Sequence, residues 1–124
     1  MLNEWEDELD YAYWVDEETN LPCKINRASH SGALCGYVGI PKVHKLYKVE
    51  YYNIEVEVHG GLTYGRLGTA KDAIEEYCWI GFDCAHSCDL LPKCDFTHCS
   101  EHTYRNWDYV KQQVTNLAKQ VSVC

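Results

Sequence analysis

Two short polar segments of the chain carry the residue types that a binding or catalytic pocket needs. Each follows an apolar stretch that predicts a β-strand, so both lie where a strand ends. The candidate ligand-binding residues are His59, Gly60, Gly61, Thr63, Tyr64, Asp83, His86 and Asp89. If the two strands are neighbours, imidazole, hydroxyl and carboxylate groups converge there, and the glycines expose backbone N–H groups that can hold an anion.

Catalysis at this pocket would use His59, Asp83 and His86. Either histidine could act as a general base oriented by Asp83, or a metal ion could lie between the histidines and Asp83 or Asp89. Cys84 as a nucleophile beside His86 is disfavoured, because residues two apart on an extended chain share a face without necessarily meeting. The sequence has no Gly-x-Ser-x-Gly, phosphate-loop or His-Glu-x-x-His motif. Because an Asp and a His at a strand end commonly fix a turn, we favour a non-enzymatic role.

A second candidate site is the Cys/His-rich loop at residues 84–102, where four cysteines and three histidines occur without periodicity. A structural zinc ion could order such a loop. The candidate ligands are Cys88, Cys94, His98, Cys99 and His102. The spacing lacks a Cys-x-x-Cys knuckle, so a disulfide between Cys88 and Cys99 or unpaired thiols remain alternatives. In a reducing compartment the eight cysteines of the chain are expected to be thiols or metal ligands.

A single α+β domain spanning residues 1–124 is the predicted framework: a small antiparallel or mixed sheet covered by an amphipathic C-terminal helix. Strands are predicted at residues 23–28, 33–40, 53–60 and 78–82. The clearest is 53–60, where Ile54, Val56 and Val58 alternate with polar residues. Helices are predicted at residues 1–14 and 70–77, and from an N-cap at Thr103 to near the C-terminus.

Charge is unevenly distributed along the chain. The net charge is −8, and eight acidic residues without a Lys or Arg fall within residues 1–19. We interpret this segment as an acidic helix or arm that either packs its apolar stripe on the body or docks a basic partner. Because no basic stripe is present to neutralise phosphates, direct nucleic-acid binding is not expected. The acidic N-terminus and the lack of a long apolar run predict a cytoplasmic protein with no membrane partner.

Several motifs resemble those of a family of small uncharacterised proteins of bacteriophages and bacterial prophages. The three longest are Leu34-Cys35-Gly36-Tyr37-Val38-Gly39-Ile40-Pro41, Val58-His59-Gly60-Gly61-Leu62-Thr63-Tyr64 and Gly81-Phe82-Asp83-Cys84-Ala85-His86. The resemblance covers residues 22–121 and also includes His44, Asp89, Tyr104-Arg105 and Tyr109-Val110. At His44 the flanking Lys42-Val43 and Lys45 depart from the family's Gly and Pro, which puts a site role for His44 in doubt. The resemblance implies no established activity, but its motifs coincide with the first candidate pocket and not with the zinc loop.

These features together predict a phage or prophage accessory protein that acts as a binding module. The expected partner is a host protein or a small ligand, and countering host defence is one role that such binding would serve. Two alternatives are a small hydrolase with a His/Asp site, with or without a metal, and a structural protein associated with the virion. The sequence carries no signal for the oligomeric state.

Overall fold

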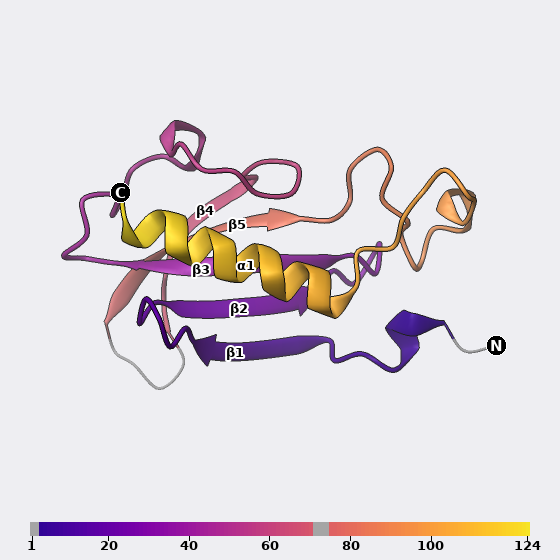
Figure 1. Ribbon diagram of the computed structural model, residues 1–124, viewed down its shortest axis with the longest axis horizontal. Coiled ribbons are helices and arrows are strands. Elements are labelled where there is room, and N and C mark those ends of the chain that lie inside the picture. The colour runs from indigo at the N-terminus through magenta and orange to yellow at the C-terminus, as the bar shows by residue number, and fades with distance from the viewer. Residues whose placement is uncertain (1–2, 71–74) are drawn as a thin grey trace.

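The computed structural model describes residues 3–70 and 75–124, and it confirms the predicted α+β class. Five antiparallel strands form one sheet in the order β1-β2-β3-β5-β4. The strands are β1 (Tyr11–Val15), β2 (Pro22–Arg27), β3 (Leu34–Pro41), β4 (Tyr64–Thr69) and β5 (Glu76–Asp83). The single α-helix among the described residues, α1 (Trp107–Ser122), lies across one face of the sheet over β2 and β3 (Figure 1).

The core fills the space between α1 and the sheet. The predicted helical stripe is buried as expected, with its side chains fully enclosed at Val110, Val114, Leu117 and Val121. Gly36 of β3 lies directly beneath this stripe, where a Cβ atom would come within 2.5 Å of Val114 Cγ2. The glycine therefore lets the helix approach the sheet closely.

The C-terminal helix begins later than predicted. Asn106 is the N-cap, and its side chain accepts a hydrogen bond from the backbone N–H of Tyr109 at 2.9 Å. The predicted cap at Thr103 is wrong because the Thr103 backbone is used elsewhere. Its N–H donates to the Cys88 carbonyl and its own carbonyl accepts from Leu90, which ties the segment before the helix to the Cys/His-rich loop.

The predicted N-terminal helix at residues 1–14 is wrong. A short 3-10 turn occupies Glu4–Glu6, and Tyr11–Val15 forms the edge strand β1, paired with β2. Aromatic and β-branched residues favour a strand where a neighbouring edge is available. The guanidinium of Arg27 on β2 also pairs with Glu8 and Asp10, which holds the acidic arm against the sheet.

The predicted strand at residues 53–60 is wrong. Asn53 ends a 3-10 turn (Tyr51–Asn53), residues 55–58 belong to no strand of the sheet, and residues 59–60 form a turn. The backbone of this segment is bonded to two glutamine side chains of α1 instead. Gln113 Oε1 accepts the His59 N–H at 2.9 Å, while the Gln120 amide accepts the Glu57 N–H and donates to the Glu57 carbonyl, both at 2.7 Å. The apolar alternation survives because one side of this segment still packs on the core.

The predicted helix at residues 70–77 lies partly outside the described residues, since 71–74 are not described. Its last two residues, Glu76 and Tyr77, belong to β5 and pair with Thr69 and Gly68 of β4. None of the helices in the described ranges has the length and apolar character that crossing a membrane requires.

Candidate functional site

His59 is the centre of a buried polar network between α1 and the loop that follows β5. Its Nε2 atom lies 2.9 Å from Asp89 Oδ2, and its Nδ1 atom lies 2.8 Å from the Tyr109 hydroxyl. Arg105 Nε donates to the other carboxylate oxygen of Asp89 at 2.9 Å, and the His86 backbone N–H donates to Asp89 at 3.0 Å. The Asp89 side chain is 2% exposed, so this carboxylate is neutralised inside the protein and not by solvent.

The protonation states in this network follow from its hydrogen bonds. Burial alone would raise the pKa of Asp89, but the bonds from His59 and Arg105 outweigh it and hold that pKa below its usual value. The bond to Asp89 in turn raises the pKa of Arg105, and burial raises the pKa of Tyr109. We therefore assign an ionised Asp89 that accepts from His59 Nε2, while the Tyr109 hydroxyl is hydrogen-bonded to His59 Nδ1.

A second group of polar side chains lies beside this network at the end of β5. Thr63 Oγ1 donates to Asp83 Oδ2 at 3.0 Å. The His86 ring lies 5.8 Å from the His59 ring, and His86 Nε2 is 3.3 Å from Asp83 Oδ1. That contact is not aligned as a hydrogen bond, and His86 Nε2 is buried without a hydrogen-bond partner among the described residues. Side chains from the two predicted polar segments thus lie close together.

Gly60 is required by the position of His86. Its φ is +69°, and a Cβ atom built there would lie 2.1 Å from His86 Nε2, whereas the adjacent Gly61, at φ +81°, has no atom within 4 Å of such a Cβ. Both substitutions to alanine therefore carry the left-handed backbone cost of roughly 1–2 kcal/mol. We expect Gly60→Ala to be more destabilising than Gly61→Ala in urea unfolding and to shift the His86 ring resonances. Equal losses in the two variants would contradict the close approach.

The structure gathers most of the residues predicted for the pocket. His59, Asp89, His86, Asp83 and Thr63 lie in the two adjoining groups described above. Tyr64 lies elsewhere, with its ring 5.1 Å from that of Tyr37 on the sheet face away from α1.

The sequence interpretation missed two residues of the network, Arg105 and Tyr109. Neither lies on the apolar stripe of the helix, and their presence among the family-like motifs was the available signal. Cys84 is 2% exposed and burial raises the pKa of its thiol, so it is a core residue and does not suit the role of nucleophile.

The Cys/His-rich loop does not bring its predicted zinc ligands together. Cys99 Sγ and His102 Nδ1 lie 2.9 Å apart, but no group of three or more metal-ligating side chains occurs within the described ranges. His98 is occupied by a 3.0 Å contact between its Nε2 atom and the Leu91 carbonyl. All eight cysteines are free, so the predicted alternative of a disulfide between Cys88 and Cys99 is not formed.

Hydrogen bonds order this loop in the structure. The buried Thr97 hydroxyl contacts the Leu91 N–H at 2.8 Å and the Cys94 carbonyl at 2.8 Å. Lys93 anchors the loop to the body, since its side chain donates to the Ser29 carbonyl at 2.6 Å and its N–H donates to the Ser31 carbonyl. Hydrogen bonds of Thr97 and Lys93 thus order the loop, a role that the sequence pattern suggested for a zinc ion.

A polar groove of about 560 Å³ opens beside His59 and Tyr109. We call it the His59 groove. Residues 57–59 form one wall and α1 forms the other, with Gln113, Asn116, Lys119 and Gln120 lining it. The Asn116 and Lys119 side chains are exposed at its mouth. The groove therefore offers amide groups, one ammonium and one carboxylate next to the buried network.

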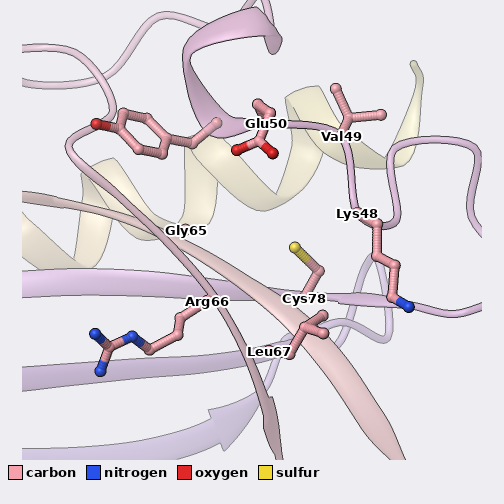
Figure 2. Close-up of a pocket in the computed structure, with 8 residues that line it drawn as sticks. Lys48, Val49, Glu50, Gly65, Arg66, Leu67 and Cys78 are labelled. Atoms are coloured by element: carbon pink, nitrogen blue, oxygen red, sulfur yellow. The ribbon is translucent and has the colours of Figure 1, made fainter.

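A slightly larger groove, of about 610 Å³, lies against β4 on the side of the sheet that bears the loop at residues 48–51. Figure 2 shows Lys48, Val49 and Glu50 on one wall, Gly65, Arg66 and Leu67 on the other, and Cys78 between them. It contains none of the histidines and no group of polar side chains converging on one point. We therefore place the candidate site at the His59 groove in spite of its smaller volume.

Comparison of the chain with models of known protein families, with curated proteins and with solved structures finds no match to any of them.

Proposed function

We propose that this protein is a non-enzymatic binding module that holds a small polar ligand in the His59 groove. The observation that supports the proposal is that the hydrogen-bonding atoms of His59 and Asp89 are already engaged within the protein. Both ring nitrogens of His59 are engaged, one by Asp89 and the other by Tyr109. A general base needs a nitrogen within reach of the proton that it removes, and here Tyr109 occupies that position.

The ionised Asp89 is equally engaged. It accepts from His59, from Arg105 and from the backbone of His86, so it fixes the loop at residues 86–89 against the start of the helix. A rigid buried network of this kind pre-organises the surface above it. The network therefore acts as the support of the groove and does not itself react.

The dimensions and lining of the groove suit a small polar ligand. Its volume falls in the range of typical ligand pockets, roughly 300–1,000 Å³. Gln113 and Asn116 contribute amide groups to the lining, and Lys119 contributes an ammonium group that also pairs with Glu18 at 3.3 Å. Glu57 on the opposite wall disfavours a ligand that carries only negative charge.

The resemblance to phage and prophage proteins supports a host-derived ligand and a role during infection, such as countering host defence. A small hydrolase is the second function to be tested, because His86 Nε2 lies near Asp83 and is not engaged in a hydrogen bond. A structural role in the virion predicts no ligand in the groove.

Filling the groove tests the proposal. We expect wild-type protein incubated with the small-molecule fraction of a bacterial lysate to retain a ligand detectable by native mass spectrometry. Asn116→Trp, which fills the mouth of the groove, should lower retention at least tenfold. Lys111→Trp, on the opposite side of α1, is the matched control and should retain it.

Two results would contradict the proposal. If the wild-type protein retains no small molecule, the groove has no ligand and the proposal is wrong. Hydrolysis of chromogenic esters or phosphoesters that is lost in His86→Gln but kept in Asn116→Trp would favour the hydrolase.

A further inference from the structure

Cys99 and His102 form a pair of side chains in the Cys/His-rich loop, apart from the His59 groove. Cys99 Sγ lies 2.9 Å from His102 Nδ1. The two residues are the ends of one turn, which the His102 N–H closes by donating to the Cys99 carbonyl at 3.2 Å. A thiol in contact with an imidazole is the arrangement of a nucleophile and its general base. The pair therefore has the residue types and the contact that thiol chemistry requires.

Backbone hydrogen bonds on both sides of the turn hold the pair in place. The Cys99 N–H donates to the carbonyl of Thr97, a buried residue, at 2.9 Å. After the turn, the Thr103 N–H donates to the Cys88 carbonyl at 2.8 Å. The thiol and the imidazole thus extend from anchored backbone, which lowers the entropic cost of bringing them together for reaction.

The other exposed cysteines lack a basic partner. Cys88 is exposed, and no hydrogen bond joins its thiol to a basic side chain in the part of the chain that the structure describes. The Cys124 thiol donates to the Gln120 carbonyl at 3.0 Å, and a carbonyl does not take up the proton. Burial raises the pKa of the Cys84 thiol and keeps reactants away from it. Cys99 alone among these four combines exposure with a base.

The surroundings of the pair favour exchange with a disulfide over acyl transfer. Acyl transfer depends on an oxyanion hole in a site that excludes water, and Cys99 lines neither of the two grooves described above. Thiol–disulfide exchange needs only an accessible thiol that attacks one sulfur of the disulfide. Glu101 is exposed in the same turn and the net charge of the chain is −8, so a neutral or cationic reactant is favoured over an anionic one.

We propose that Cys99 is a site of thiol–disulfide exchange with small neutral or cationic disulfides, and that His102 is its general base. His102 Nδ1 takes the thiol proton, and the Cys99 sulfur attacks one sulfur of the reactant. The S–S bond of the reactant breaks, a mixed disulfide forms at Cys99, and the proton passes to the leaving thiolate. The Cys99 sulfur is oxidised and the leaving sulfur is reduced, so the disulfide itself is the oxidant. This reaction is independent of the His59 groove.

Exchange rates measured at each cysteine test the proposal. Reduced wild-type protein is treated with 2-hydroxyethyl disulfide at pH 7 in the presence of a chelator, quenched with acid and analysed by peptide mass spectrometry. We expect Cys99 to react at least tenfold faster than Cys88, which controls for exposure. Cationic cystamine should modify Cys99 faster than anionic dithiodiglycolate does. Equal rates at Cys99 and Cys88 would overturn the proposal, and faster reaction with the anionic disulfide would overturn the assigned reactant class.

Substitutions of two histidines in the loop separate the base from the order of the loop. His102→Ala should lower the rate at Cys99 at least tenfold without changing the rate at Cys88, and free imidazole should restore part of it. His98→Ala is the matched control, because it removes another hydrogen bond of the loop but no contact with the thiol. An unchanged rate in His102→Ala, an equal loss in His98→Ala or a lack of rescue by imidazole would contradict the role of His102. Asn116→Trp should exchange normally, which distinguishes this site from the groove.

Discussion

Replacing Asp89 by alanine is expected to lower the free energy of unfolding by about 3–5 kcal/mol, because removing one partner of a buried ion pair leaves the other uncompensated. Arg105 and His59 would both lose their acceptor, and the His86 N–H would lose its bond. Urea unfolding followed by circular dichroism measures the loss. The matched control is Asp83→Ala, whose carboxylate is 33% exposed and should contribute no more than about 1 kcal/mol.

The pH dependence of the free energy of unfolding is a second measure of how much Asp89 stabilises the fold. The folded-state pKa of Asp89 lies below its ordinary value of 3.8, so the unfolded chain binds this proton more tightly. The stabilisation is therefore complete above the ordinary value and is lost as the pH falls through the lowered folded-state value. Asp89→Asn should flatten the fall in stability below pH 3.8. An unchanged acid profile, or equal losses in the Asp83 and Asp89 alanine variants, would show that the network does not hold the loop.

Gly36→Ala is expected to cost about 3 kcal/mol, at the upper end of the range for overpacking a core. The new Cβ would lie 2.5 Å from Val114 Cγ2 and 2.7 Å from the Phe82 ring, and neither neighbour has room to move. Gly68→Ala on β4 is the matched control, because its nearest contact would be the Trp79 ring at 3.6 Å. Thermal and urea unfolding of both variants measure the difference.

A double substitution shows whether the cost comes from the helix contact. Adding Val114→Ala removes the methyl group that the new Cβ meets, so the double variant should lose less stability than the sum of the two single variants. Strictly additive losses would mean that the Phe82 contact or the strand itself carries the cost.

The sequence predicted the parts of this fold whose pattern reflects burial alone. Strands β2, β3 and β5 and the helix α1 each bury a periodic set of apolar side chains, which is visible without knowing their partners. The segment at residues 53–60 has the same signature but pairs with side chains of α1. The alternation of apolar residues indicates that one side of a segment is buried. It does not indicate which groups form hydrogen bonds with the backbone of that segment.

The prediction that His59 and Asp89 lie close together is correct, but not for the expected reason that two neighbouring strands deliver them. His59 follows a segment that Gln113 of α1 holds, Asp89 follows β5, and the two side chains meet. Arg105 and Tyr109 reach the network from the start of α1, which no periodicity of their own indicates. In the Cys/His-rich loop, residue type suggested a metal, whereas the loop is ordered by the hydroxyl of Thr97, a residue without a distinctive pattern.

The two glutamines of α1 that hold residues 57–59 also determine how the His59 groove could be lost. At position 120 an amide nitrogen donates to the Glu57 carbonyl. Deamidation to glutamate would exchange that nitrogen for an oxygen that cannot donate, and two acceptors would then repel each other across the groove. Ageing of a single side chain, with no change in the sheet or the core, would remove one of the bonds that hold this wall and leave it to the bonds at His59.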